Sequence, residues 1–175
     1  MKFTLIVHKL MHSDKTLFLI KSISSRLTKI FLRLEILRIL EENGTDLVKV
    51  CICHVDVQID IKYCKKLCNQ GVFIEFDNFD KEFLMDREKG GFAGGDFAKD
   101  KERVKAIVEL IDSGFISNIL LSNDICLKTL LHNYGGRGYD HLLTNIVPML
   151  KNEGLNEDDI HELIIGNPKK FLENH

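Results

Sequence analysis

The sequence has no hydrophobic run long enough to cross a lipid bilayer, no strong excess of charge and no even set of cysteines. A transmembrane helix needs about 20 consecutive apolar residues, and no stretch of this chain approaches that length. A formal net charge of -2 gives no bulk attraction to nucleic acid or to an anionic membrane. Five cysteines, scattered among the expected strands and helices, do not resemble a secreted disulfide framework. We therefore expect a cytoplasmic protein with reduced thiols that binds neither nucleic acid nor a membrane.

Three further features resemble functional motifs but lack essential parts of them. The glycine-rich stretch 90–95 has no Lys-Ser/Thr pair and so is not a P-loop; a flexible active-site loop fits it better. His161-Glu162 is not part of a His-Glu-x-x-His zinc motif, and we interpret 158–163 as a solvated helix face. Cys64 and Cys68 have a spacing that can bind metal on a helix, but without a second pair nearby they are better interpreted as buried thiols.

What the sequence does contain is a regular alternation of apolar strands and amphipathic helices. At 175 residues with 45% hydrophobic content, the chain fits one domain with a substantial core. Strands separated by helices favour parallel pairing through right-handed crossovers. The pattern predicts strands at 48–53, 72–77 and 119–122 and helices at 34–42, 59–68, 96–112, 139–152 and 157–165, with a last short helix capped by Asn167.

Two polar residues follow strands directly. His54 ends the apolar run 48–53, and Asp124 follows the run 119–122. Because the carboxyl ends of parallel strands meet at one edge of the sheet, where chemistry gathers in such folds, we expect them to share a site. The alternatives are a packed histidine and an aspartate that caps the segment 125–131. Asp77, at the tip of the intervening strand, either lines a pocket or caps a loop.

Side chains alternate along a strand, so the strand that ends at His54 has two distinct faces. Val50 and Ile52 share the face of His54, whereas Cys51 and Cys53 point to the other. We therefore expect the two cysteines to pack against helices rather than to join His54 in one metal shell.

Residues 1–32 differ from the rest of the chain. Residues 1–7 predict a strand that ends at His8. Residues 13–32 are rich in Ser, Lys and aliphatic residues, with Asp14 as the only acid. This composition resembles a transit peptide, but such a signal normally begins at the N-terminus itself. We favour a divergent helix or a poorly bounded gene start.

Seven segments together resemble a known family. They follow one another in order and with sensible spacing, and the resemblance covers residues 34–173. They resemble the phosphotriesterase-related branch of the amidohydrolase superfamily. The segments are 39–47, 50–56, 71–77, 119–124, 134–141, 142–150 and 162–171.

The resemblance implies a fold and a chemistry. Members are (β/α)₈ barrels with a two-metal centre, usually zinc, that hydrolyse esters, lactones, amides or phosphoesters of small molecules with a metal-bound hydroxide. The implied fold class is α/β: a partial TIM barrel of roughly strands 5/6 to 8 with a parallel sheet. Residues 33–175 would form this C-terminal half, after a divergent segment 1–32.

The resemblance also assigns residues. His54 matches the sixth-strand metal ligand, and Asp124 matches the eighth-strand aspartate, which is both ligand and general base. His8 is the candidate for the fifth-strand histidine, and Arg137 and Tyr139 are candidates for substrate contacts.

Part of the family's site has no counterpart in this sequence. We find neither the first-strand His-x-His pair nor the bridging Lys or Glu of the fourth strand. A complete barrel usually needs about 250 residues. Two hypotheses follow: a zinc-dependent hydrolase, or a catalytically incompetent C-terminal fragment that needs the missing strands. The second predicts a homo-oligomer or assembly with a complementary half-barrel, because an open half-barrel leaves strand edges exposed.

Overall fold

The computed structural model describes residues 4–12, 15–23, 26–82 and 97–173, with side chains described from residue 33 onward. Its strands form one sheet in the order β1-β2-β3-β4-β5, in which β2 to β5 run parallel and β1 pairs antiparallel with β2. The strands are β1 Thr4–His12, β2 Lys15–Ile23, β3 Val50–Ile52, β4 Phe73–Phe76 and β5 Ile119–Leu121. The helices are α1 Arg26–Glu42, α2 Ile61–Cys68, α3 Asp100–Asp112, α4 Val147–Asn152, α5 Glu157–His161 and α6 Asn167–Glu173.

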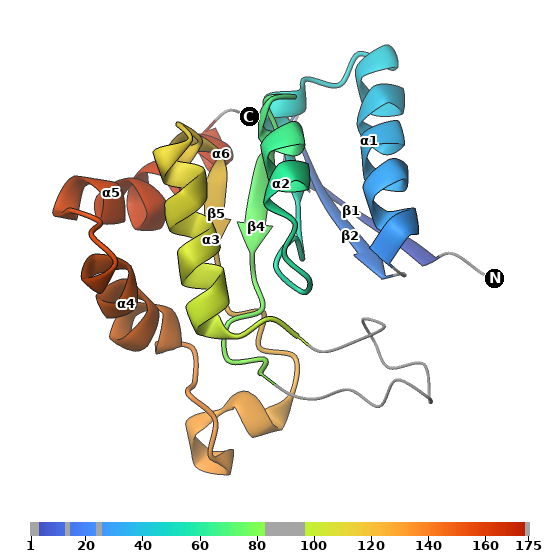
Figure 1. Ribbon diagram of the computed structural model, residues 1–175. Coiled ribbons are helices and arrows are strands. Elements are labelled where there is room, and N and C mark those ends of the chain that lie inside the picture. Colours follow the sequence, from blue (N-terminus) through green and yellow to red (C-terminus); the bar gives the residue numbers. More distant parts are fainter. Residues whose placement is uncertain (1–3, 13–14, 24–25, 83–96, 174–175) are drawn as a thin grey trace.

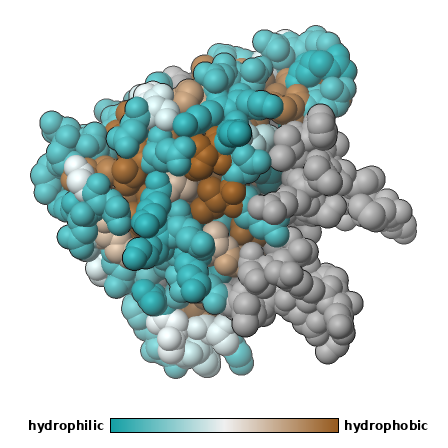
Figure 2. Space-filling model, in the orientation of Figure 1, coloured by the Kyte–Doolittle hydropathy of each residue, from teal (hydrophilic) through white to brown (hydrophobic). Residues whose placement is uncertain are grey.

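Helices α1, α2 and α3 lie side by side along one face of the sheet (Figure 1). Helix α1 connects β2 to β3, α2 connects β3 to β4, and α3 connects β4 to β5. Each connection returns the chain to a neighbouring strand that runs parallel. Seen from this side, hydrophilic residues cover most of the surface, and hydrophobic residues show between them near the centre of the view (Figure 2). No helix among the described residues combines the length and hydrophobicity that a membrane span requires.

The two faces of the sheet carry two separate apolar clusters. On the helix side, Val50, Ile52 and Ile74 pack in the main core with residues of α2 and α3. On the other face, the smaller cluster consists of Cys51, Cys53, Phe73, Leu120 and Phe171. The predicted alternation along β3 is therefore confirmed, and the helix that the two cysteines meet is α6, which carries Phe171, rather than α2 or α3.

The predicted elements between residues 33 and 173 are present, with shifted ends. The helix expected from residue 59 begins at Ile61, because Asp60 caps it by accepting from the Tyr63 amide. Gly71 follows this helix at φ 82°, a conformation that favours glycine, and turns the chain into β4. The helix expected at 96–112 begins at Asp100, and the predicted glycine-rich loop lies outside the described residues.

The expectation that Asn167 caps the last helix is wrong. Asn167 has helical dihedrals, φ -63° and ψ -47°, because the chain enters α6 directly from the π-helical segment Glu162–Gly166. Its buried side chain instead donates to the carbonyls of Ile116 and Ile119, at 2.7 and 2.8 Å. The asparagine thus ties α6 to the start of β5.

The N-terminal expectations need two corrections. Residues 15–23 form a strand rather than a helix, because a short continuous apolar run fits a buried parallel strand as well as a helix. Helix α1 does begin within the segment, at Arg26. The strand expected to end at His8 instead runs to His12, so His8 lies in mid-strand, opposite Leu19.

Candidate active site at the carboxyl edge of the sheet

His54 and Asp124 both lie at the carboxyl edge of the sheet, as their positions in the sequence predict. His54 follows β3 by two residues and Asp124 follows β5 by three. Both have positive φ, 57° and 41°, and among the described residues Asp80 is the only other residue besides glycine with this conformation. Backbone strain of this kind costs about 1–3 kcal/mol and gathers at functional sites. The strain therefore gathers in the segments that follow β3, β4 and β5.

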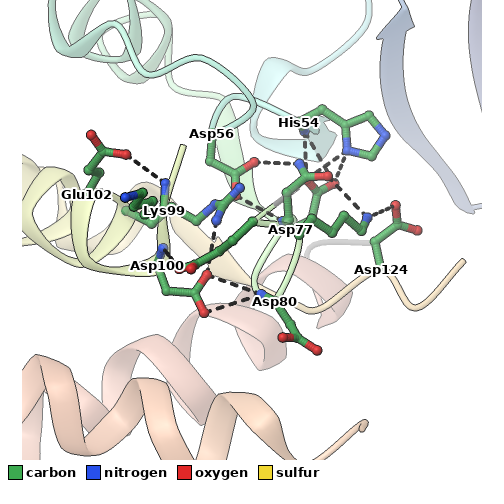
Figure 3. Close-up of polar contacts among 12 residues, drawn as sticks. His54, Asp56, Asp77, Asp80, Lys99, Asp100, Glu102 and Asp124 are labelled. Atoms are coloured by element: carbon green, nitrogen blue, oxygen red, sulfur yellow. Dashed lines mark hydrogen bonds and ion pairs between the residues drawn. The ribbon is translucent and has the colours of Figure 1, made fainter. Parts of the chain in front are cut away.

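Asp77 at the tip of β4 holds His54 in place. Its carboxylate accepts from the His54 amide at 3.1 Å and lies 2.7 Å from the ring Nδ1 (Figure 3). Both residues are buried. A carboxylate on one ring nitrogen fixes the tautomer and orientation of a histidine, and this arrangement is typical of metal-binding histidines. The predicted alternatives for Asp77, a pocket lining or a loop cap, miss this positioning role.

Asn78 and Lys81 connect the histidine to the aspartate. The Asn78 amide group donates to Asp77 at 2.7 Å, and its oxygen accepts from Lys81 at 3.1 Å. The buried ammonium of Lys81 also donates to Asp124 at 2.7 Å. The side chains from the ends of β3, β4 and β5 therefore form one continuous polar network.

The capping alternative for Asp124 is wrong. The next helical turn begins only at Lys128 and is preceded by Leu127. The Asp124 side chain meets Lys81 instead.

A second, deeper network supports this edge. Arg103 of α3 is fully buried and donates from Nε to Asp56 at 2.9 Å and from Nη1 to Asp100 at 3.0 Å. Asp56 also accepts twice from Asn78, which joins the two networks. His141 lies 2.8 Å from the other oxygen of Asp100. Sequence reasoning missed this support, although the spacing of His54 and Asp56 on one strand end could have indicated it.

Burial, hydrogen bonds and nearby charges together shift the pKa values of Asp77 and Asp100. Burial, with the nearby carboxylates Asp56, Glu75 and Asp124, raises the pKa of Asp77 well above that of an ordinary carboxyl. Burial would also raise the pKa of Asp100, but the hydrogen bond from His141 and the charge of Arg103 outweigh it and lower that pKa. The edge of the sheet is therefore rich in negative charge and favours a cation.

The raised pKa of Asp77 predicts a pH dependence of stability. The folded chain keeps a proton that the unfolded chain releases above about pH 4, so the free energy of unfolding falls as pH rises toward the folded-state pKa. We expect Asp77→Asn to remove this part of the fall in urea denaturation measured across that range. Asp140→Asn is the control, because a hydrogen bond from His132 lowers the pKa of Asp140. The contribution of Asp140 to the free energy of unfolding therefore rises with pH, and this variant should remove that rise. If the free energy of unfolding depended on pH in the same way in wild type and in Asp77→Asn, the raised pKa of Asp77 would be contradicted.

The remaining predicted site residues, Arg137, Tyr139 and His8, occupy different positions. Arg137 follows β5 in the loop at the same edge and pairs with Asp80, at 3.3 Å between Nε and the carboxylate. Tyr139 is 75% exposed in that loop. The β-sheet register places His8 level with Cys51, three positions before His54, and its strand runs in the opposite direction. Asp80 accepts from the Arg137 amide at 3.0 Å and donates from its own amide to Asp100 at 3.1 Å, so Arg137 connects to the deeper network.

Comparison with known proteins identifies the family. The model of the phosphotriesterase family matches residues 22–172. The chain belongs to the phosphotriesterase family. An N-acetyltaurine hydrolase of Dictyostelium discoideum is 40% identical over 140 residues, 79% of this chain and 37% of that protein. The human N-acetyltaurine hydrolase is 36% identical over 139 residues, 79% of this chain and 39% of that protein.

Solved structures show the same relationship. A resiniferatoxin-binding protein from Rhodobacter sphaeroides superposes with a TM-score of 0.75 at 30% identity, over 84% of this chain and 40% of that protein. The Escherichia coli phosphotriesterase homology protein, which carries phosphate in its active site, superposes with a TM-score of 0.68 at 28% identity, over 81% of this chain and 44% of that protein. The chain spans about two fifths of the length of these relatives. The predicted family and the predicted α/β partial barrel are confirmed.

The donors at this edge fit the metal chemistry of the phosphotriesterase family. An imidazole and a carboxylate are both ligands that zinc accepts. The carboxylate on His54 Nδ1 makes Nε2 the nitrogen through which this residue would bind a metal. Within the described part of the chain no third histidine, cysteine or carboxylate completes a three-ligand group with His54 and Asp124. Two such donors would make up only part of a metal site.

Proposed function

We propose that this chain forms the C-terminal part of a zinc-dependent amide hydrolase, with N-acetyltaurine as the candidate substrate. The network that joins His54 to Asp124 at the strand ends carries this proposal. The names of the relatives at 36 and 40% identity supply the substrate class. His54 and Asp124 would each bind a metal, and the remaining ligands, those of strands one, four and five, would complete a two-zinc site.

When bound, the two metals would supply the chemistry of a Lewis acid: they would lower the pKa of a water molecule and polarise the substrate carbonyl. Asp124 accepts the proton of the attacking water and passes it to the leaving amine. Asp77 keeps the His54 ring in one tautomer throughout, since its carboxylate lies at Nδ1. The guanidinium of Arg137, at the mouth of the site, is placed to attract an anionic group of the substrate when it leaves Asp80.

Lys81 has a role that follows from its contacts. Its ammonium neutralises Asp124 at 2.7 Å and is itself almost fully buried. A metal bound by Asp124 would compete with this ammonium for the same carboxylate. We propose that Lys81 turns toward Asn78 in the loaded enzyme, because Asn78 already accepts a hydrogen bond from it.

The decisive experiment supplies the strands that complete the barrel. We propose co-expressing the full chain with the part of the Dictyostelium relative that precedes the matched region. A complementary pair should co-purify and bind close to two zinc ions. It should also release taurine from N-acetyltaurine, in an activity that a chelator removes and zinc restores. An assembled, zinc-loaded pair that hydrolyses ester or lactone substrates but not N-acetyltaurine would show that the substrate belongs to another class. A zinc-loaded pair that hydrolyses none of these substrates would refute the proposed function.

The second hypothesis is a catalytically incompetent fragment that assembles with a partner. Measurements on the purified chain alone distinguish it from the first. Analytical ultracentrifugation of the purified chain tests it directly. Oligomers that the complementary half converts to a one-to-one complex would support assembly through the open strand edges. A monodisperse monomer that unfolds cooperatively and does not bind the complementary half would count against it.

A further inference from the structure

A second group of potential ligands lies on the strands themselves, below the edge that carries His54. It consists of Cys51 on β3, Cys53 directly after that strand and Glu75 on β4. The two sulfur atoms and a carboxylate oxygen all lie within 4.8 Å of one another. In the described part of the chain, this is the one group of at least three histidine, cysteine or carboxylate side chains with such close ligand atoms.

The sheet register explains why these three side chains meet. Cys51 and Cys53 are two residues apart on one strand and so project from the same face. Cys51 pairs with Phe73 and Ile52 with Ile74, so the next pair in this parallel register joins Cys53 to Glu75. Paired residues of neighbouring strands project to the same side. Three ligands on two adjacent strands are thus held by the backbone rather than by flexible loops.

We propose that Cys51, Cys53 and Glu75 bind one thiophilic divalent cation of the zinc class. Two thiolates and a carboxylate are a ligand set that zinc and cadmium accept, with a water molecule in the fourth position of a tetrahedron. Two sulfur atoms on one zinc ion lie about 3.8 Å apart, given a Zn–S distance of about 2.3 Å. The observed spacing therefore needs to contract by at most about 1 Å. Binding replaces the two thiol protons, which pass to solvent, and involves no oxidation or reduction.

The surroundings of the group favour a cation. Ser122, the residue directly after β5, donates a hydrogen bond from its hydroxyl to the Glu75 carboxylate at 2.9 Å. This hydrogen bond helps to hold the carboxylate in its position beside the two cysteines. Burial, the neighbouring Cys53 and, to a smaller extent, the carboxylates Glu75 and Asp77 raise the pKa of the Cys51 thiol, because they disfavour a further negative charge. A divalent cation reverses this penalty, since it compensates the charge of both thiolates.

An apolar shell closes the group on one side. Both cysteines are fully buried and belong to the cluster of Phe73, Leu120 and Phe171. Such a shell excludes water from thiolate ligands and strengthens their bond to a metal. The same shell would also accommodate two packed thiols without a metal. The experiment therefore has to distinguish a ligand pair from a pair of buried thiols.

The test is a cadmium titration of the reduced full chain. Cadmium bonded to thiolate has a characteristic ultraviolet charge-transfer absorption. We expect wild type to bind one cadmium ion per chain with this absorption. Cys51→Ser/Cys53→Ser should lose the absorption, and its affinity for cadmium should fall at least tenfold. Glu75→Gln should keep the absorption while losing about 10-fold in affinity. Since Glu75 is only partly buried, this variant decides the question if the double serine variant does not fold.

Two controls locate the binding. Cys64→Ser/Cys68→Ser removes a buried pair from α2 and should leave the absorption intact, although it removes the same number of thiols. His54→Ala, which damages the proposed zinc site at the sheet edge, should also leave it intact, so the two proposals fail independently. The proposal is overturned if wild type shows no thiolate absorption with cadmium, or if the absorption survives Cys51→Ser/Cys53→Ser. It is also overturned if Glu75→Gln binds cadmium as tightly as wild type.

Discussion

Replacing Arg103 with methionine is expected to lower the free energy of unfolding by about 3–5 kcal/mol, the cost of removing one partner from a buried ion pair. The guanidinium is fully buried and donates to the carboxylates of Asp56 and Asp100. Methionine fills a similar volume but donates nothing. Asp56, also fully buried, would then keep only its two hydrogen bonds from Asn78. Urea denaturation followed by circular dichroism measures the change.

Arg38 provides the matched control for this prediction. It lies on α1 and pairs with Glu35 and Glu42 one helical turn away on either side, with all three side chains more than half exposed. Exposed pairs of this kind contribute about 0–1 kcal/mol. Arg38→Met should therefore unfold at nearly the urea concentration of wild type. Similar losses for the two variants would mean that burial of the Arg103 network does not decide its contribution.

The same substitution should reach the candidate active site. Asp56 accepts from the side-chain nitrogen of Asn78 at 2.7 Å, and that nitrogen also lies 2.7 Å from Asp77. Asp77 in turn holds His54. The charge on Asp56 that Arg103 stabilises therefore fixes Asn78, and Asn78 fixes the carboxylate on the histidine. Stability and the orientation of His54 depend here on one chain of contacts.

The sequence predicted the edge residues because each of them follows a strand. A parallel sheet brings its carboxyl ends together, so His54 and Asp124 converge without any knowledge of tertiary packing. It did not predict the network beneath them. Arg103, Asp100 and His141 lie in helices or loops whose charged positions look the same in sequence whether they meet water or a buried partner. The helical periodicity of apolar residues identifies the apolar stripe of α3. It does not identify the charged side chains that are buried near the N-terminal end of this helix.

The N-terminal region shows the second limit of sequence reasoning. The run Leu17-Phe18-Leu19-Ile20 is too short and too uniformly apolar for its period to distinguish a strand from a helix. Its pairing with β3 settles the matter, and that pairing is a long-range contact. The same limit applies to Asn167, where helix propensity and capping preference point to a cap while two backbone carbonyls of the preceding strand region bind the side chain.

The largest functional effect is expected from Asp124. In the zinc-loaded assembly with the complementary half, Asp124→Asn should lower kcat by about 10²–10⁴-fold, because an amide neither accepts the proton of the attacking water nor compensates a metal's charge. His54→Ala should instead act first on zinc content, because it removes a proposed metal ligand outright. Steady-state kinetics together with metal analysis separates these two outcomes.

Asp46→Asn is the control for both variants, since Asp46 is exposed and precedes β3, at the opposite edge of the sheet from His54. It should leave kcat and zinc content near those of the unsubstituted assembly. An Asp124→Asn assembly with full zinc content and undiminished kcat would show that this carboxylate is not the base. Because Lys81 neutralises Asp124 in the structure, Lys81→Met adds a decisive comparison. If the ammonium competes with the metal for this carboxylate, that variant should bind zinc more tightly rather than less.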